Sequence, residues 1–217
     1  IGKVHTGVDV TPATKGTDGL EVTVGFGEML VLVPAVEGLT TCFLDFGADD
    51  YREALGVLCK SLDEDARLTE LGVIALQAML VDALQARLLC EEGWRRHPEA
   101  ADVRIERPLV IVGLPRTGTT ALHHLMAQAP GVQALEHWLM RTPKPRPPRD
   151  AWDEDADYRA ALARVDLMFA RSPDMRAIHE IEAFLPDECW NLFSQNFVHS
   201  SYEANADVRG YAEWWAK

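Results

Sequence analysis

The centre of the chain reads Arg107-Pro108-Leu109-Val110-Ile111-Val112-Gly113-Leu114-Pro115-Arg116-Thr117-Gly118-Thr119-Thr120. The continuous apolar and β-branched run within residues 107–113 predicts a strand over these residues that is buried on both faces, as in a parallel sheet. Gly113 and Gly118 predict a turn after the strand, and residues 121–129 predict a helix that ends before Pro130. The order of strand, glycine-bearing loop and helix favours the α/β class.

The loop has the glycine spacing of a nucleotide-triphosphate P-loop, G-x-x-x-x-G-K-[ST], but lacks the lysine. Gly113 and Gly118 occupy the glycine positions, and Thr120 occupies the hydroxyl position. Thr119 stands where lysine is expected, and the cation lies inside the loop at Arg116. Backbone N–H groups, the start of a helix and an arginine fork all favour a bound anion. A kinase or ATPase must neutralise a multiply charged γ-phosphoryl group, usually with Mg²⁺. A sulfuryl group carries less charge, so a loop with one cation and no metal ion suits sulfuryl transfer.

Residues 112–120 resemble the 5′-phosphosulfate loop of the sulfotransferase family, whose form is P-[KR]-[ST]-G-T-[ST]. The segments Arg96-His97-Pro98-Glu99 and Pro186-Asp187-Glu188-Cys189 resemble the bacterial branch, and the likeness covers roughly residues 46–217. The resemblance implies a three-layer α/β fold, with a P-loop-like parallel sheet flanked by helices and an N-terminal helical extension.

The same resemblance implies the reaction and its donor. A sulfuryl group would pass from 3′-phosphoadenosine-5′-phosphosulfate to a hydroxyl of a small-molecule alcohol or phenol, without a metal ion. Arg116 would contact the transferring group. The cofactor-binding residues would be Arg116, Thr117, Gly118, Thr119 and Thr120.

A general base for the acceptor hydroxyl is expected elsewhere, because the family uses a histidine or a carboxylate for this step. His179 is the first choice, since its segment lies near the acceptor pocket in the bacterial branch. Glu136 and His137 are the second choice, because some branches keep an acidic base near this position. The histidines show no recognisable metal-ligand spacing, and a chemical role for His123 or His124 is a lesser possibility.

The pattern along the chain predicts three parts: an irregular or short-strand arm over 1–45, a helical extension over 46–106, and the N-terminal part of the α/β domain over 107–217. Apolar spacing predicts helices from Asp49 or Asp50 to Leu62, over 65–95 and over 152–171. A further helix is predicted to start near Pro186. The basic, proline-rich segment 141–149 predicts an exposed, solvated loop, with a ligand role as the alternative.

The family's site for the 3′-phosphate, an arginine and a serine on later elements, has no counterpart in this sequence. We expect it to lie beyond Lys217. The chain is then truncated at its C-terminus, and residues 1–217 alone are expected to be inactive and prone to associate.

The composition limits the partners. The 217 residues include 21 Lys and Arg against 34 Asp and Glu, a net charge of −13, which argues against nucleic acid and anionic membranes. The four cysteines are scattered, and no stretch near the N-terminus is long enough to span a bilayer, so a soluble cytoplasmic protein is expected. A P-loop kinase-like phosphotransferase and a non-catalytic phosphate-binding module remain alternatives. The acceptor and the oligomeric state are open.

Overall fold

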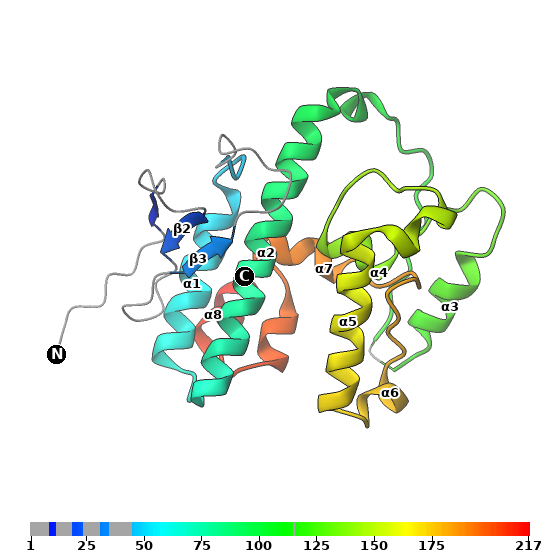
Figure 1. Cartoon of the computed structure of the whole chain (residues 1–217). Coiled ribbons are helices and arrows are strands. Elements are labelled where there is room, and N and C mark those ends of the chain that lie inside the picture. Colours follow the sequence, from blue (N-terminus) through cyan, green and yellow to red (C-terminus); the bar gives the residue numbers. More distant parts are fainter. Residues whose placement is uncertain (1–8, 12–18, 24–30, 35–44, 115) are drawn as a thin grey trace. The chain divides into compact units, whose positions relative to one another are not determined.

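The computed structural model describes residues 9–11, 19–23, 31–34, 45–114 and 116–217, which are mainly helical (Figure 1). The chain forms two compact units. Unit 1 comprises residues 1–92 and 192–217, and unit 2 comprises residues 93–191.

Unit 1 begins with a small antiparallel sheet. Its strands are β1 (Asp9–Thr11), β2 (Gly19–Thr23) and β3 (Val31–Pro34), in the order β1-β2-β3. Val10 pairs with Val22, and Leu20 pairs with Val33. This sheet lies in the segment for which the sequence predicts short strands or an irregular arm.

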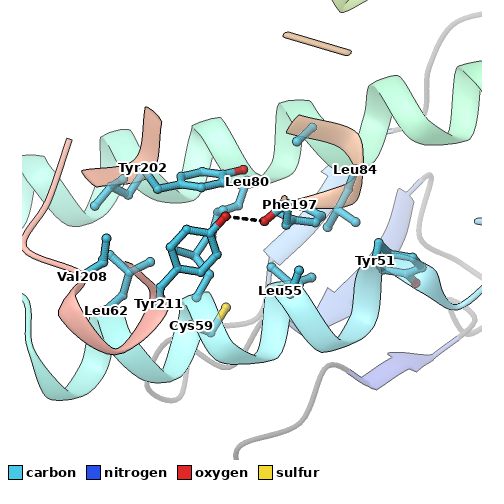
Figure 2. Close-up of a cluster of buried hydrophobic side chains, with 14 of the residues drawn as sticks. Tyr51, Leu55, Cys59, Leu62, Leu80, Leu84, Phe197, Tyr202, Val208 and Tyr211 are labelled. Atoms are coloured by element: carbon cyan, nitrogen blue, oxygen red, sulfur yellow. Dashed lines mark hydrogen bonds between the residues drawn. The ribbon is translucent and has the colours of Figure 1, made fainter. Parts of the chain in front are cut away.

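The core of unit 1 lies between helices. Helix α1 (Asp50–Glu64) buries side chains at spacings of three and four, and these pack with the buried side of α2 (Glu70–Arg96) and with α8 (Arg209–Trp215). The Tyr211 hydroxyl donates to the carbonyl of Phe197 at 2.6 Å inside this core (Figure 2). The predicted helices from Asp49 or Asp50 to Leu62 and over 65–95 are thus confirmed, the second with a later start.

Arg87 holds the start of α1 against α2. This buried side chain donates to the carbonyls of Phe46 (2.6 Å) and Ala48 (2.7 Å), to Asp50 Oδ1 (2.6 Å) and to Asn196 Oδ1 (2.6 Å). A buried guanidinium is tolerated because its donors are satisfied in this way.

Helix α2 is the one described helix that is long and apolar enough, by length and composition, to cross a bilayer. Its residues Leu76, Leu80 and Leu84 are buried in the core of unit 1. A core helix passes the same test, so this composition does not indicate a membrane protein.

Unit 2 is organised around an aromatic cluster. Trp138, on α4 (His137–Arg141), meets the rings of Trp152 at 5.3 Å and Tyr158 at 5.5 Å, edge to face. Trp152 lies on the 3₁₀ helix Arg149–Glu154, and Tyr158 lies on α5 (Ala156–Arg171). The predicted helix over 152–171 is therefore a 3₁₀ turn followed by an α-helix. The other helices of unit 2 are η1 (Pro98–Asp102), α3 (Thr119–Met126) and α6 (Met175–Ile178). Helix α7 (Trp190–Phe193) begins where unit 2 ends.

The predicted buried strand over 107–113 is not present. Residues 108–114 are extended without strand pairing, and their apolar side chains are largely exposed, Val112 to 87%. An extended segment becomes a strand only when a neighbour pairs with it, and unit 2 as described contains just one isolated antiparallel bridge, Glu136 with Pro186. The predicted parallel sheet is thus not formed by the described residues.

One local prediction was also wrong. No helix starts near Pro186, because this residue takes part in the bridge, and α7 starts at Trp190. The predicted exposed loop over 141–149 is confirmed in part, because residues 143–148 form no helix or strand and Arg146 and Arg149 are exposed, but its cations also contact protein groups. Lys144 donates to Asp155 and Asp157 at 2.6–2.8 Å, and Arg149 lies over the Trp152 ring at 4.5 Å.

Candidate functional site

The loop after residue 112 is shaped by its glycines. A Cβ on Gly113 would lie 2.7 Å from Thr119 Cγ2 and 2.9 Å from Thr117 Oγ1, so only glycine fits without displacing these side chains. Gly118 has φ +89°, in the left-handed region that favours glycine. The Thr117 hydroxyl donates to the Leu114 carbonyl at 2.7 Å and closes the turn.

Helix α3 begins directly after Gly118, and no side chain caps its N-terminus. The first N–H groups of a helix have no partner within the helix, and the helix dipole adds positive potential there. Thr119 and Thr120 add two hydroxyls in the first turn. This end of α3 is therefore suited to an anion.

Arg116 lies within the same loop. Its backbone is left-handed, with φ 67°, and its side chain is exposed. Within the described ranges, no hydrogen bond or ion pair engages its guanidinium. Its five donors are thus available to a ligand.

Helix α3 is anchored to the segment 180–188 at two points. Thr120 Oγ1 donates to Glu188 Oε1 at 3.0 Å. His124 Nε2 lies 2.9 Å from the carbonyl of Pro186, and its Nδ1 lies 3.9 Å from Glu180 Oε2. These contacts give the His124 ring a structural role between α3 and this segment.

The segment 183–187 in turn lies antiparallel to residues 135–138. The His137 amide donates to the Leu185 carbonyl at 2.9 Å, and the Asp187 amide donates to the Leu135 carbonyl at 3.1 Å. Pro186 sits between these two bonds, at a position that needs no N–H. The backbone thus fixes the register of the two segments.

This register brings together two side chains that are 50 residues apart. His137 Nδ1 lies 2.6 Å from Asp187 Oδ2, and the two side chains are only 13% and 7% exposed. Asp187 also accepts from the Glu188 amide at 2.7 Å and from Asn191 Nδ2 at 3.5 Å. Burial raises the pKa of Asp187, but these hydrogen bonds, with that of His137 foremost, outweigh it and hold the pKa below its usual value.

Two other candidate bases lie in the same unit. His179 follows α6, is half-buried, and its charge also lowers the pKa of Asp187. Glu136 is already engaged, because its Oε2 lies 2.8 Å from Arg146 Nη2. Glu136 and Arg146 line a hollow of about 500 Å³ together with eight further residues: Ala127, Gln128, Val132, Gln133, Ala134, Phe184, Leu185 and Pro186.

The sequence did not assign a role to Asp187 or Asn191, although Asp187 lies in a quoted motif. Both residues become candidates only because residues 135–138 pair with residues 183–187, and no local sequence pattern predicts this pairing. Among the residues that the structure describes, no group of three or more His, Cys, Asp or Glu side chains is arranged to hold a metal ion. Cys59, Cys90 and Cys189 are free.

Comparison with known proteins bears on most of unit 2 and on the C-terminal part of unit 1. Residues 108–217 match the sequence profile described as the sulfotransferase family. The crystal structure of sulfotransferase STF1 from Mycobacterium tuberculosis H37Rv (type1 form) is similar, with 44% identity and a TM-score of 0.73 over 80% of this chain. The chain spans 48% of that protein's chain. No curated protein gives a significant match.

The matched region contains the P-loop-like segment 113–120, the N-terminus of α3 and the hydrogen-bonded pair of His137 and Asp187. The resemblance that the loop motif predicts is thereby confirmed at the level of the family, and the chain belongs to the sulfotransferase family.

Proposed function

We propose that this chain carries the donor site of a sulfotransferase that moves a sulfuryl group from 3′-phosphoadenosine-5′-phosphosulfate to a hydroxyl of a small-molecule alcohol or phenol. The observation that carries the proposal is the uncapped N-terminus of α3 beside the unengaged cation of Arg116. Together they offer amide, hydroxyl and guanidinium donors to one compact anion.

The donor's 5′-phosphosulfate fits these groups. The amides that open α3 and the hydroxyl of Thr119 bind the phosphate oxygens, and Arg116 reaches the bridging oxygen. Thr117 and Thr120 contribute through their backbone amides, because their hydroxyls donate to the Leu114 carbonyl and to Glu188. In the in-line step the acceptor oxygen bonds to sulfur while the bond from sulfur to the bridging oxygen breaks. Negative charge grows on the bridging oxygen, so a cation placed there stabilises the transition state more than the ground state.

The acceptor loses a proton in the same reaction, and a histidine near Asp187 receives it. The sequence favours His179 over Glu136 and His137, and the hydrogen bond between His137 and Asp187 supports His137. Both belong to unit 2, as does the loop.

A cytoplasmic location belongs to the same proposal, supported by the three free cysteines. The reaction needs the 3′-phosphate of the donor to be held as well. The described residues provide one evident anion site, at the loop, so the activity of the whole protein remains part of the proposal.

The test is a pair of calorimetric titrations, with 3′,5′-adenosine diphosphate and with ATP–Mg²⁺. We expect heat of binding from the first ligand and a loss of that heat in Arg116→Ala. Preference for ATP–Mg²⁺ would favour a kinase-like activity, and binding of neither ligand at millimolar concentration would contradict a donor site.

A further inference from the structure

We propose that Asp187 is a positioning residue, which holds His137 in the Nδ1–H tautomer so that Nε2 of His137 receives the proton of the sulfuryl acceptor. This inference rests on the proposed function, and it names the base and the group that orients it. It also reverses the order in which the sequence ranks the bases.

The geometry of the pair comes from the backbone. The His137 amide donates a hydrogen bond to the Leu185 carbonyl, and the Asp187 amide donates one to the Leu135 carbonyl. These two bonds place the side chains of His137 and Asp187 diagonally across the antiparallel bridge. His137 is also the first residue of α4, and the next residue, Trp138, is fully buried in the aromatic cluster. The backbone of His137 is therefore fixed beside Asp187 by the core of unit 2.

The tautomer of His137 follows from the chemistry of its partner. An ionised carboxylate only accepts hydrogen bonds, so at 2.6 Å the Nδ1 of His137 must carry the hydrogen. In the neutral ring the lone pair is then on Nε2. Nε2 makes no hydrogen bond to any described residue, and it is free to accept a proton.

Asp187 is itself held in place on both oxygens. Oδ1 accepts from the Glu188 amide, and Oδ2 accepts from His137 and from Asn191. A carboxylate that is fixed in this way orients the ring and stabilises the imidazolium that forms when Nε2 takes the proton.

The pair is also tied to the donor loop. Glu188, whose amide binds Asp187, accepts from the Thr120 hydroxyl at the start of α3. A chain of two side-chain contacts therefore joins the first turn of α3 to the carboxylate behind His137. Neither rival has such support: the ring of His179 makes no hydrogen bond with the described residues, and Glu136 is paired with Arg146.

The acceptor O–H gives its proton to Nε2 of His137 as the new bond from oxygen to sulfur forms. The bond from sulfur to the bridging oxygen breaks, and its electron pair leaves with 3′,5′-adenosine diphosphate. The imidazolium then returns the proton to water.

The first test is independent of activity. Nitrogen-15 NMR of histidine-labelled protein, with His137 assigned through His137→Gln, reports which ring nitrogen carries hydrogen. We expect Nδ1–H in the wild type, loss of that preference in Asp187→Asn, and no change in the exposed control Asp166→Asn. A wild-type ring protonated on Nε2 would overturn the proposal, even if Asp187→Asn failed to fold.

The second test measures turnover in the full-length protein, as release of 3′,5′-adenosine diphosphate in the presence of a panel of phenols. We expect His137→Gln to lower kcat by about 10²–10⁴-fold with little change in the donor KM. If Asp187 acts through His137, adding Asp187→Asn to His137→Gln costs nothing more, whereas a merely structural role gives additive losses and overturns the proposal.

His179→Gln separates the two histidines. We expect it to keep most of the turnover, and loss there with survival in His137→Gln would assign the base to His179. A wild-type protein that transfers no sulfuryl group would contradict the proposed function, while the NMR spectrum would still decide whether Asp187 sets the tautomer.

Discussion

The hydroxyl of Thr120 donates to the carboxylate of Glu188 at 3.0 Å, across 68 residues of sequence. This bond connects the first turn of α3 with the segment that carries Asp187. The donor loop and the candidate base of unit 2 are therefore parts of one hydrogen-bonded arrangement.

A double-mutant cycle tests this link. Thr120→Val and Glu188→Gln should each destabilise unit 2, and the two changes together should cost less than their sum by about 0.5–3 kcal/mol. Urea unfolding of the four proteins gives the coupling energy. Strictly additive changes in the free energy of unfolding would mean that the contact contributes nothing. The control is Thr117→Val combined with Glu188→Gln, which should be additive because Thr117 bonds to Leu114 instead.

Arg116→Ala should lower turnover more than it weakens donor binding. In the proposed mechanism the guanidinium meets the charge that develops on the bridging oxygen, and removal of one such donor typically costs about 10²–10³ in rate. Release of 3′,5′-adenosine diphosphate gives the rate, and calorimetry gives the affinity. Near-normal turnover in Arg116→Ala would remove Arg116 from the site.

The free energy of unfolding should fall on mild acidification because of His199. Burial lowers the pKa of His199 from 6.5 to about 4, so the folded state favours the neutral ring. The stabilisation is full above the unfolded pKa and is lost as the pH falls from about 6.5 toward 4, by up to about 3 kcal/mol. Urea unfolding between pH 7.5 and 4.5 should show a slope that His199→Gln reduces and the exposed control His97→Gln retains.

Arg87→Met should destabilise unit 1 strongly. The change leaves the carbonyls of Phe46 and Ala48 without this donor and removes the pair with Asp50. Breaking a buried charge network costs about 3 kcal/mol or more. Lys60→Ala removes only an exposed pair with Glu64 and should change stability by less than about 1 kcal/mol. Equal midpoints of thermal unfolding for these two variants would refute this role of Arg87.

Local patterns were enough to predict the long helices and the loop. Helix α1 follows from apolar residues at spacings of three and four, and α3 (Thr119–Met126) overlaps the predicted helix over 121–129, although it starts two residues earlier and ends three residues earlier. The family also followed from the loop, because a cation between two glycines in place of the P-loop lysine is a local feature.

Non-local contacts could not be predicted in this way. The run 109–112 has the composition of a buried strand, yet an extended segment needs a partner, and the described part of unit 2 offers it none. Pro186 resembles a helix start but occupies a bridge position that requires no N–H. Asp187 gains its partner only when residues 135–138 lie against 183–187.

The central claim is that the loop and the start of α3 bind the sulfuryl donor, and amide NMR tests it most directly. Titration of nitrogen-15-labelled protein with 3′,5′-adenosine diphosphate detects even weak binding, one residue at a time. The account predicts that the amides of Gly118, Thr119 and Thr120 shift first and furthest, and that ATP–Mg²⁺ shifts them less. Unchanged amides at these three residues, or larger shifts with ATP–Mg²⁺, would contradict it.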